Sequence, residues 1–402
     1  MLGAAFSGVR VLDFSQIGAG PLCGMLMGDM GADVIKIEAL SGDLGRRLGP
    51  PWLNGESVIA MSFNRNKRGL AIDLKKPAAL AAVRRMAARA DVLIESFRPG
   101  VMVRLGLGYA ALAAVRPTLV YCSVSAYGQT SPWRERAGVD GIVQAISGLM
   151  SNIGIEGAPP CKVQVPAVDM TTGFLAALAV SAALRTAERS GRGEHLDVSM
   201  YNASMLLQLP ALATYFASGE KPARIGSAAP YAAPNEAVPT KDGWIMLAAY
   251  QEDRWKALCE LIGRPELATD PSFANIAARV KNRARMADIL SAAFRNKSTR
   301  EWMPLLEERD ILCAPIADYD EVTSTDQFAA SGVAVQIDHP VAGRLKLPGF
   351  AIGDLDAQSR QHRPPPVVGQ HSVEVLAEYG VPRDAIDRLV ADGAVVQQEI
   401  SS

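Results

Sequence analysis

The first half of the 402-residue sequence alternates short β-branched runs with Ala-rich amphipathic stretches. Val9 to Phe14 is followed by a helical stretch from Pro21 to Met30 and a strand-like run from Asp33 to Glu38. The same order returns further along the chain, at residues 70–74, 77–89, 91–95 and 119–125. This alternation predicts a mostly parallel sheet with helices on both faces, because parallel strands are joined by crossover connections that cover the sheet.

A second structural unit is expected, because the chain exceeds the roughly 250–300 residues at which a single hydrophobic core stops growing. The segment 219–240 is rich in Pro, Gly and Ala, which indicates a linker. A strand from Trp244 to Ala248 and three helical stretches follow it, and the chain becomes rich in loop residues after Cys313.

Charge and composition exclude several classes of protein. Lys and Arg number 41 against 42 Asp and Glu, so no overall charge attracts nucleic acid or an anionic membrane surface. The apolar stretch Phe174 to Leu184 is shorter than the roughly 20 residues that cross a bilayer, and the N-terminus lacks the features of a signal peptide. The five cysteines are scattered and the four histidines have no metal-ligand spacing. We therefore expect a cytoplasmic protein without a metal site.

Two local features each allow two interpretations. Gly18-Ala19-Gly20 follows a strand and opens a helix, so its N–H groups could cradle a phosphate, or it could be a plain tight turn. Basic residues gather near the ends of predicted strands, at Arg65, Lys67, Arg68, Lys75, Lys76, Arg98 and Arg104. They could bind a polyphosphate at the carboxyl edge of the sheet, or each could be a solvated surface charge.

Asp169 stands at the start of a long helical stretch that ends near Arg189. One interpretation makes Asp169 the N-cap of this helix. The other makes it a nucleophile, because the helix N-terminus stabilises the anion and a free Asp carboxyl, with a pKa of about 3.9, is ionised at neutral pH. Such a carboxylate could attack a thioester carbonyl without a general base.

Several stretches follow one another in the order and spacing of a known family. They are Val9 to Phe14 leading to Ala19-Gly20-Pro21, Gly31 to Glu38 with Gly42-Asp43, Asn66-Lys67-Arg68, Glu95 to Gly100 with Arg104-Leu105-Gly106, Gly191-Arg192-Gly193 and Gly369-Gln370-His371. Over nearly its whole length the chain resembles the CaiB/BaiF-type, or family III, CoA-transferases. Asp169 falls at the position of their nucleophile.

The resemblance implies an α/β fold, with a large Rossmann-like domain that carries a parallel sheet and a smaller α+β domain. The large domain would comprise 1–220 together with 325–402 and the small domain 225–324, with linkers around 219–240 and 313–350. Two subunits would form an interlocked homodimer. CoA or acyl-CoA would bind as a substrate, without a metal, nicotinamide or flavin, through residues that match by position: Ile17, Gly18, Lys75, Phe97, Arg98 and Arg104.

The mechanism that the resemblance implies runs through acyl anhydrides. Asp169 attacks the donor thioester and expels CoA thiolate, which then attacks the anhydride, frees the donor acid and leaves an aspartyl-CoA thioester. The acceptor carboxylate attacks this thioester, and CoA finally takes the acceptor acyl group. Backbone N–H groups are expected to stabilise each oxyanion.

Three alternatives to a transferase remain open from the sequence. Val139 and Asp140 are expected at the substrate site. Acyl-CoA racemases share the fold but carry a His at the position of Val139, and valine cannot exchange protons. The chain could also be the non-catalytic subunit of a heteromeric transferase, although such a subunit would be expected to lose Asp169. A nicotinamide-dependent dehydrogenase rests only on Gly18-Ala19-Gly20.

The substrate pocket is expected to differ from that of the formyl-CoA transferases, because the chain lacks their run of consecutive glycines in the small domain. Ser96 also stands where many relatives carry Asn. Arg46 and Arg47 could meet the far carboxylate of a dicarboxylic acid, since Arg matches carboxylate geometry with two parallel hydrogen bonds. This hypothesis makes succinyl-CoA the donor and leaves the acceptor acid open.

Overall fold

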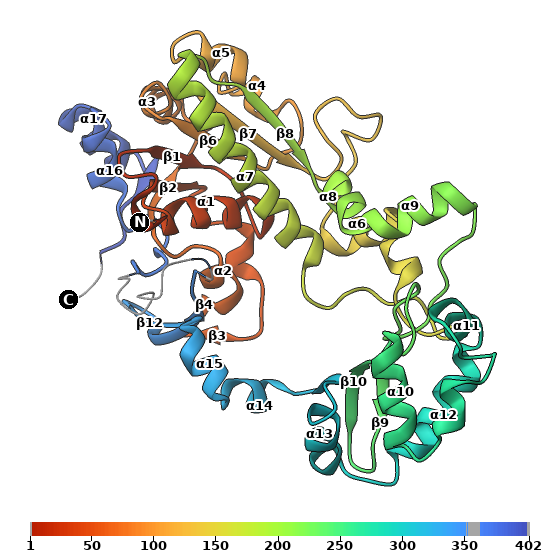
Figure 1. Ribbon diagram of the computed structural model, residues 1–402. Helices are drawn as coiled ribbons and strands as arrows, with labels where there is room; N and C mark the ends of the chain where they lie inside the picture. The colour runs from red at the N-terminus through yellow and green to blue at the C-terminus, as the bar shows by residue number, and fades with distance from the viewer. Residues whose placement is uncertain (1, 351, 353–361, 400–402) are drawn as a thin grey trace. The chain divides into compact units, whose positions relative to one another are not determined.

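The computed structural model describes residues 2–350, 352 and 362–399, and the chain divides into two compact units (Figure 1). The first unit comprises Met1–Met150, Lys162–Glu220 and Ala329–Ser402. The second comprises Ser151–Cys161 and Lys221–Phe328. Each unit has a hydrophobic core of its own.

A seven-stranded sheet forms the centre of the first unit, in the order β14-β5-β2-β1-β6-β7-β8. The strands are β1 (Arg10–Asp13), β2 (Asp33–Glu38), β5 (Lys67–Ile72), β6 (Val92–Glu95), β7 (Val120–Ser125), β8 (His195–Ser199) and β14 (Val395–Val396). Six strands are parallel, and β14 pairs antiparallel with β5. The six parallel strands follow the Rossmann order 3-2-1-4-5-6, which confirms the expected α/β class.

Helices cover both faces of this sheet, as the alternating sequence pattern requires (Figure 1). On one face, α1 (Ala19–Asp29) and α7 (Ala167–Ser190) share a core with β1, β2, β6 and β7. On the other face, the core is shared by α3 (Pro77–Ala87), α4 (Val101–Arg104), α5 (Tyr109–Ala113), α16 (Ser372–Glu378) and α17 (Arg383–Ala391). The C-terminal helices thus pack on the sheet that the N-terminal half builds.

Helix α7 is long and apolar enough to cross a membrane by length and composition alone. The sequence analysis considered only the run from Phe174 to Leu184 and so underestimated the apolar length of this helix. Its buried side chains, among them Val180 and Ala183, pack in the core of the first unit. This packing accounts for the apolar residues on the buried face of the helix, whereas Phe174 and Leu178 are exposed.

The remaining elements of the first unit include a β12–β13 hairpin that the sequence analysis left as loop. They are β3 (Trp52–Leu53), β4 (Glu56–Ser57), α2 (Val58–Ser62), α6 (Asp140–Ile146), α8 (Met200–Leu207), α9 (Leu209–Ser218), β12 (Ala334–His339) and β13 (Gly343–Pro348), with α15 (Asp326–Ser331) at its boundary. The apolar stretch from Asn202 to Ala217, whose pattern alone predicts one helix, forms two helices. They meet at Gln208, and Pro210 stands in the first turn of α9, where its missing N–H group costs nothing.

The second unit is built on a three-stranded antiparallel sheet in the order β11-β10-β9. Its elements are β9 (Asn235–Pro239), β10 (Trp244–Ala248), α10 (Glu252–Leu261), α11 (Ile276–Lys281), α12 (Arg283–Phe294), α13 (Thr299–Glu307), β11 (Leu312–Pro315) and α14 (Tyr319–Thr323). Large buried side chains, including Trp255, Phe273 and Trp302, form its core. Strand β9 lies inside the segment that the composition indicated as a linker.

Candidate active site

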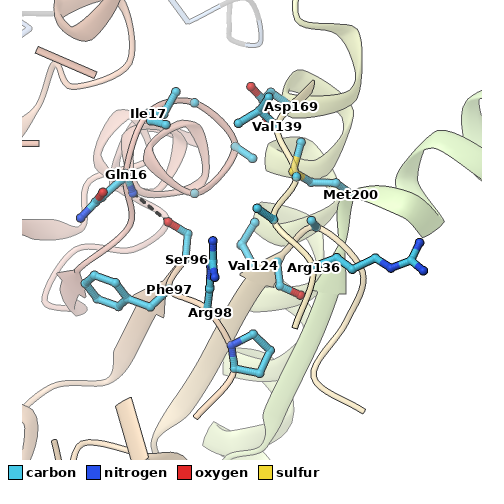
Figure 2. A pocket seen from close by; sticks show the side chains of 18 of the residues that line it. Gln16, Ile17, Ser96, Phe97, Arg98, Val124, Arg136, Val139, Asp169 and Met200 are labelled. Atoms are coloured by element: carbon cyan, nitrogen blue, oxygen red, sulfur yellow. Dashed lines mark hydrogen bonds between the residues drawn. The ribbon is translucent and has the colours of Figure 1, made fainter. Parts of the chain in front are cut away.

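The carboxyl ends of β1 and β6 border a cavity of about 300 Å³ (Figure 2). These two strands are neighbours, and the chain proceeds from them toward opposite edges of the sheet. In doubly wound sheets this topological switch point is where ligands bind. The loop after β1 lines the cavity with Gln16, Ile17 and Gly18, and the loop after β6 lines it with Ser96, Phe97 and Arg98.

A hydrogen bond ties these two loops together. The backbone N–H group of Gln16 donates to the hydroxyl oxygen of Ser96 at 2.9 Å (Figure 2). Ser96, the residue that departs from the family pattern, therefore fixes the two sides of the switch point relative to one another.

Asp169 lines the same cavity from the third residue of α7. It is not the N-cap of this helix, because the N-cap is Pro166. The buried carboxylate of Asp140 instead accepts the backbone N–H groups of Val168 at 2.9 Å and Asp169 at 3.1 Å. Gln144 Nε2 donates to the other oxygen of Asp140 at 2.5 Å. Asp140 thus caps the N-terminus of α7, and the Asp169 carboxylate lines the cavity.

Two glycines allow this carboxylate to approach the start of α1. A Cβ added at Gly18 would lie 2.9 Å from Asp169 Oδ2, which is closer than real Cβ atoms come. A Cβ added at Gly173 would lie 2.8 Å from the carbonyl oxygen of Ala19. Both positions therefore need glycine for α1 and α7 to meet at their N-terminal ends.

Burial and charge shift the proton affinity of Asp169. Burial, followed by the neighbouring Asp140 carboxylate, raises the pKa of Asp169 to about 7. The sequence alone predicts an ionised carboxylate at neutral pH, from the pKa of a free Asp and the effect of the helix N-terminus. The two missing causes come from tertiary structure, which places the side chain in the cavity wall and a second acid behind it.

Comparisons with known proteins agree with this geometry. A model of CoA-transferase family III matches residues 6–372. The chain belongs to this family. A succinyl-CoA:glutarate CoA-transferase of Mus musculus is 35% identical over 394 residues, which cover 98% of this chain and 90% of the mouse protein. A succinate–glutarate CoA-transferase of Agrobacterium fabrum is 35% identical over 381 residues, which cover 92% of this chain and 95% of the relative.

A solved structure extends the comparison to three dimensions. The crystal structure of a CaiB/BaiF family protein from Brucella suis matches with a TM-score of 0.80 and 33% sequence identity, covering 93% of this chain and 98% of that chain. The family that the sequence motifs indicated, and with it the expectation of a transferase enzyme, is therefore confirmed.

Six of the residues expected at the site of this CoA-transferase line the cavity together: Ile17, Gly18, Phe97, Arg98, Val139 and Asp169. Asp140 lies directly behind Asp169 and binds its backbone. Lys75 and Arg104 are exposed and do not line the cavity. The CoA contacts expected of these two residues therefore lie outside the cavity that holds Asp169.

Two arginines at the cavity escaped the sequence analysis. Arg134 and Arg136 line it after β7, and the Arg136 guanidinium lies 4.7 Å from the centre of the Trp133 ring. In Figure 2 the Arg136 side chain extends away from the other labelled side chains. Their place after the carboxyl end of a predicted parallel strand was the available signal.

Arg46 does not reach the cavity, which corrects its predicted substrate contact. Its guanidinium forms two hydrogen bonds with Glu38, at 2.9 and 2.7 Å, and a third with the carbonyl oxygen of Pro366 at 2.8 Å. Glu56 lies 3.4 Å from the remaining nitrogen. Arg47 is exposed and donates to Ser41 at 3.3 Å, and it does not line the cavity either.

The basic cluster at the start of β5 is also structural. Lys67 is fully buried and donates to Asp13 at 2.8 Å, and Arg65 pairs with Asp29 at 2.5 Å. Arg68 pairs with Asp33, Glu374 and Glu378. Because buried cations need such partners, these three residues are engaged with protein carboxylates and not with a polyphosphate. Among the described residues, no group of three His, Cys, Asp or Glu side chains could hold a metal ion.

Proposed function

We propose that the enzyme transfers CoA from succinyl-CoA to a dicarboxylic acid such as glutarate, with Asp169 as the nucleophile. The observation that carries this proposal is the position of the Asp169 carboxylate. It lines the switch-point cavity next to Gly18, and the N-terminus of α7 is capped by Asp140 and not by Asp169. The names of the mouse and Agrobacterium relatives support succinyl and glutaryl groups as the pair of acyl groups exchanged.

Each step of the proposed reaction exchanges one acyl bond for another. An Asp169 oxygen attacks the donor thioester carbon, the C–S bond breaks, and CoA leaves as the thiolate. The thiolate attacks the Asp169 carbonyl carbon of the mixed anhydride, releasing succinate and forming an aspartyl-CoA thioester. The acceptor carboxylate repeats the first step on this thioester, and the thiolate then takes the acceptor acyl group and restores Asp169.

Backbone N–H groups at the start of α1 are the proposed oxyanion donors. The first N–H groups of a helix have no intrahelical acceptor, and α1 begins at Ala19, directly after Gly18. Gly18, Ala19 and Gly20 all line the cavity. Fixed donors at the position where negative charge develops stabilise the tetrahedral intermediates of acyl transfer.

The contact with a far carboxylate is proposed for Arg47 alone, which does not line the cavity but belongs to the turn that borders it. The Arg46 guanidinium is held by Glu38, whereas Arg47 is exposed at the end of the 3₁₀ turn Leu44–Arg47. Leu44, at the other end of this turn, lines the cavity. Replacing Arg47 with Ala is expected to raise KM for succinyl-CoA more than KM for a monocarboxylic acyl-CoA.

The enzyme is also proposed to work as a homodimer, as its family resemblance implies. Large apolar side chains stand exposed on α7 and α9 of the isolated chain, with Leu178 at 67% and Phe216 at 78% exposure. An exposed apolar surface of this kind is typical of an interface between subunits. Light scattering during gel filtration should give the mass of a dimer, and a monomer would overturn this part of the proposal.

The test of the function uses purified enzyme with succinyl-CoA and glutarate. Mass spectrometry is expected to detect glutaryl-CoA and free succinate in equal amounts from the wild type and none from Asp169→Asn. If both proteins fail, exchange of the α-proton of a 2-methylacyl-CoA in deuterated water would favour the racemase alternative. Val139, which is 56% exposed at the cavity where racemases carry a His, speaks against that outcome.

A further inference from the structure

Ile17, beside the nucleophile, has a backbone conformation that an isoleucine rarely adopts. Its φ angle is +68°, in the left-handed region, where a β-branched side chain clashes with the backbone. Residues held in this way persist only where the surrounding structure enforces the conformation, and they cluster at functional sites. Ile17 immediately precedes Gly18, where an added Cβ would lie 2.9 Å from Asp169 Oδ2.

A buried carboxylate holds Ile17 in this conformation. The backbone N–H group of Ile17 donates to both oxygens of Asp43, at 3.1 and 3.3 Å. Asp43 also accepts the N–H group of Gly45 at 2.8 Å, and its own N–H group donates to Glu38 at 2.7 Å. Asp43 is therefore fixed on several sides while it holds the loop.

A buried cation completes the arrangement. Lys36 Nζ lies 2.5 Å from Asp43, and the two side chains are only 1% and 3% exposed. Lys36 also donates to the carbonyl oxygen of Ser15, two residues before Ile17. Burial opposes the charge on Asp43, but the Lys36 ammonium and the two backbone N–H groups lower its pKa below the ordinary value. The Lys36–Asp43 ion pair thus binds the loop at two backbone groups, the carbonyl oxygen of Ser15 and the N–H group of Ile17.

We propose that Lys36 and Asp43 are positioning residues that act on catalysis by holding Ile17 in its left-handed conformation. They line no part of the cavity themselves. Their effect reaches the chemistry through the backbone, because the Ile17 conformation sets where Gly18 and the first N–H groups of α1 lie relative to Asp169. This inference rests on the proposed function for its activity measurements and on the geometry of the loop for its structural measurement.

The test removes the ion pair and then removes the strain. Lys36→Met/Asp43→Leu replaces both charges by apolar side chains of similar size, so that neither charge is left buried without a partner. Lys36→Met/Asp43→Asn keeps an oxygen that can accept the Ile17 N–H group. Each pair of substitutions is made with Ile17 and again with Ile17→Gly, because glycine adopts the left-handed conformation without the side-chain clash.

In the Ile17 background, kcat is expected to fall about 10- to 100-fold for the Leu variant and less for the Asn variant, because a displaced reacting group costs rate on this scale. In the Ile17→Gly background, the Leu variant is expected to keep kcat within about threefold of Ile17→Gly alone, since coupled residues give non-additive effects. An equal loss of kcat in both backgrounds, or no loss in either, would overturn the proposal.

A control and an activity-independent measurement complete the test. Asp29→Asn breaks another buried ion pair of the same unit, with Arg65, and is expected to leave kcat unchanged. Hydrogen exchange of the Ile17 amide, which Asp43 protects, should speed up in the Leu variant and not in Asp29→Asn. Unchanged exchange would contradict the holding role even if the wild type proved to transfer no CoA, an outcome that would refute only the proposed function.

Discussion

The carboxylate of Asp140 accepts the backbone N–H group of Asp169 at 3.1 Å, so two adjacent acids divide two tasks between them. Asp140 caps α7 and is itself bound by Gln144, whereas Asp169 faces the cavity. The same proximity places a negative charge behind Asp169 and, after burial, contributes to its raised pKa. Asp140 therefore affects both the position and, together with burial, the pKa of Asp169.

The activity of the enzyme should depend on the ionisation of Asp169. Because the proposed attacking group is the carboxylate and burial raises its pKa to about 7, kcat/KM for succinyl-CoA is expected to fall as the pH drops through 7. Replacing Asp140 with Asn removes the second cause of the raised pKa and should move this limb to lower pH. A pH–rate profile of both proteins measures the effect, and identical limbs would contradict the influence of Asp140.

Gly18 should tolerate no side chain. Its added Cβ would lie 2.9 Å from Asp169 Oδ2, so Gly18→Ala must displace the Asp169 carboxylate or the loop, and kcat is expected to fall about 100-fold. Gly141→Ala is a matched control, because its Cβ would meet Lys162 at an ordinary 3.6 Å. Steady-state kinetics give kcat for the two variants. Equal values would show that the loop accommodates a side chain at position 18 without loss of activity.

Glu95 should make the stability of the fold depend on pH. Burial raises its pKa to about 7, so the folded state holds a proton that the unfolded state has lost above about pH 4.5. The stabilising contribution of Glu95 is therefore greatest below pH 4.5 and declines as the pH rises to 7, by roughly 3 kcal/mol. Urea unfolding should show that the free energy of unfolding of the wild type falls relative to that of Glu95→Gln as the pH rises from 4.5 to 7. A difference between the two proteins that does not change with pH would rule the explanation out.

CoA binding should depend more on Arg98 than on the other basic residues that the sequence motifs suggested. Arg98 lines the cavity and has no ion-pair partner among the described residues, whereas Lys75 and Arg104 lie outside the cavity. Arg98→Ala is expected to raise KM for acyl-CoA about tenfold with little change in kcat. Titration calorimetry checks the loss of affinity for CoA, with Lys75→Ala and Arg104→Ala as comparisons. A larger loss of affinity in either of these two variants would place CoA elsewhere.

Much of the large sheet could be predicted, because its strands are β-branched runs separated by amphipathic helices. The run Asp33 to Glu38 has the predicted bounds. The break between α8 and α9 at Gln208 escaped prediction because the apolar pattern continues through it. The β12–β13 hairpin escaped because Pro340 and Gly343, which flank its short turn, are equally typical of an irregular loop.

The site could be predicted where local motifs determine it and not where tertiary partners do. Gly18 and Asp169 stand at helix starts, which a sequence pattern reveals. Arg46 and Lys67 looked like ligand-binding cations, since a sequence does not show that Glu38 and Asp13 lie opposite them. The raised pKa of Asp169 depends on burial and on Asp140, 29 residues away in the chain, so only the folded structure reveals it.

The central claim, that Asp169 carries the acyl group and then CoA, can be tested on the protein itself. The enzyme is mixed with succinyl-CoA without an acceptor, quenched with hydroxylamine, digested and mapped by mass spectrometry. We expect a hydroxamate at Asp169 in the wild type, because hydroxylamine captures both the anhydride and the thioester, and none in a sample without succinyl-CoA. A hydroxamate at another acidic residue, or none while glutaryl-CoA still forms when glutarate is added, would contradict it.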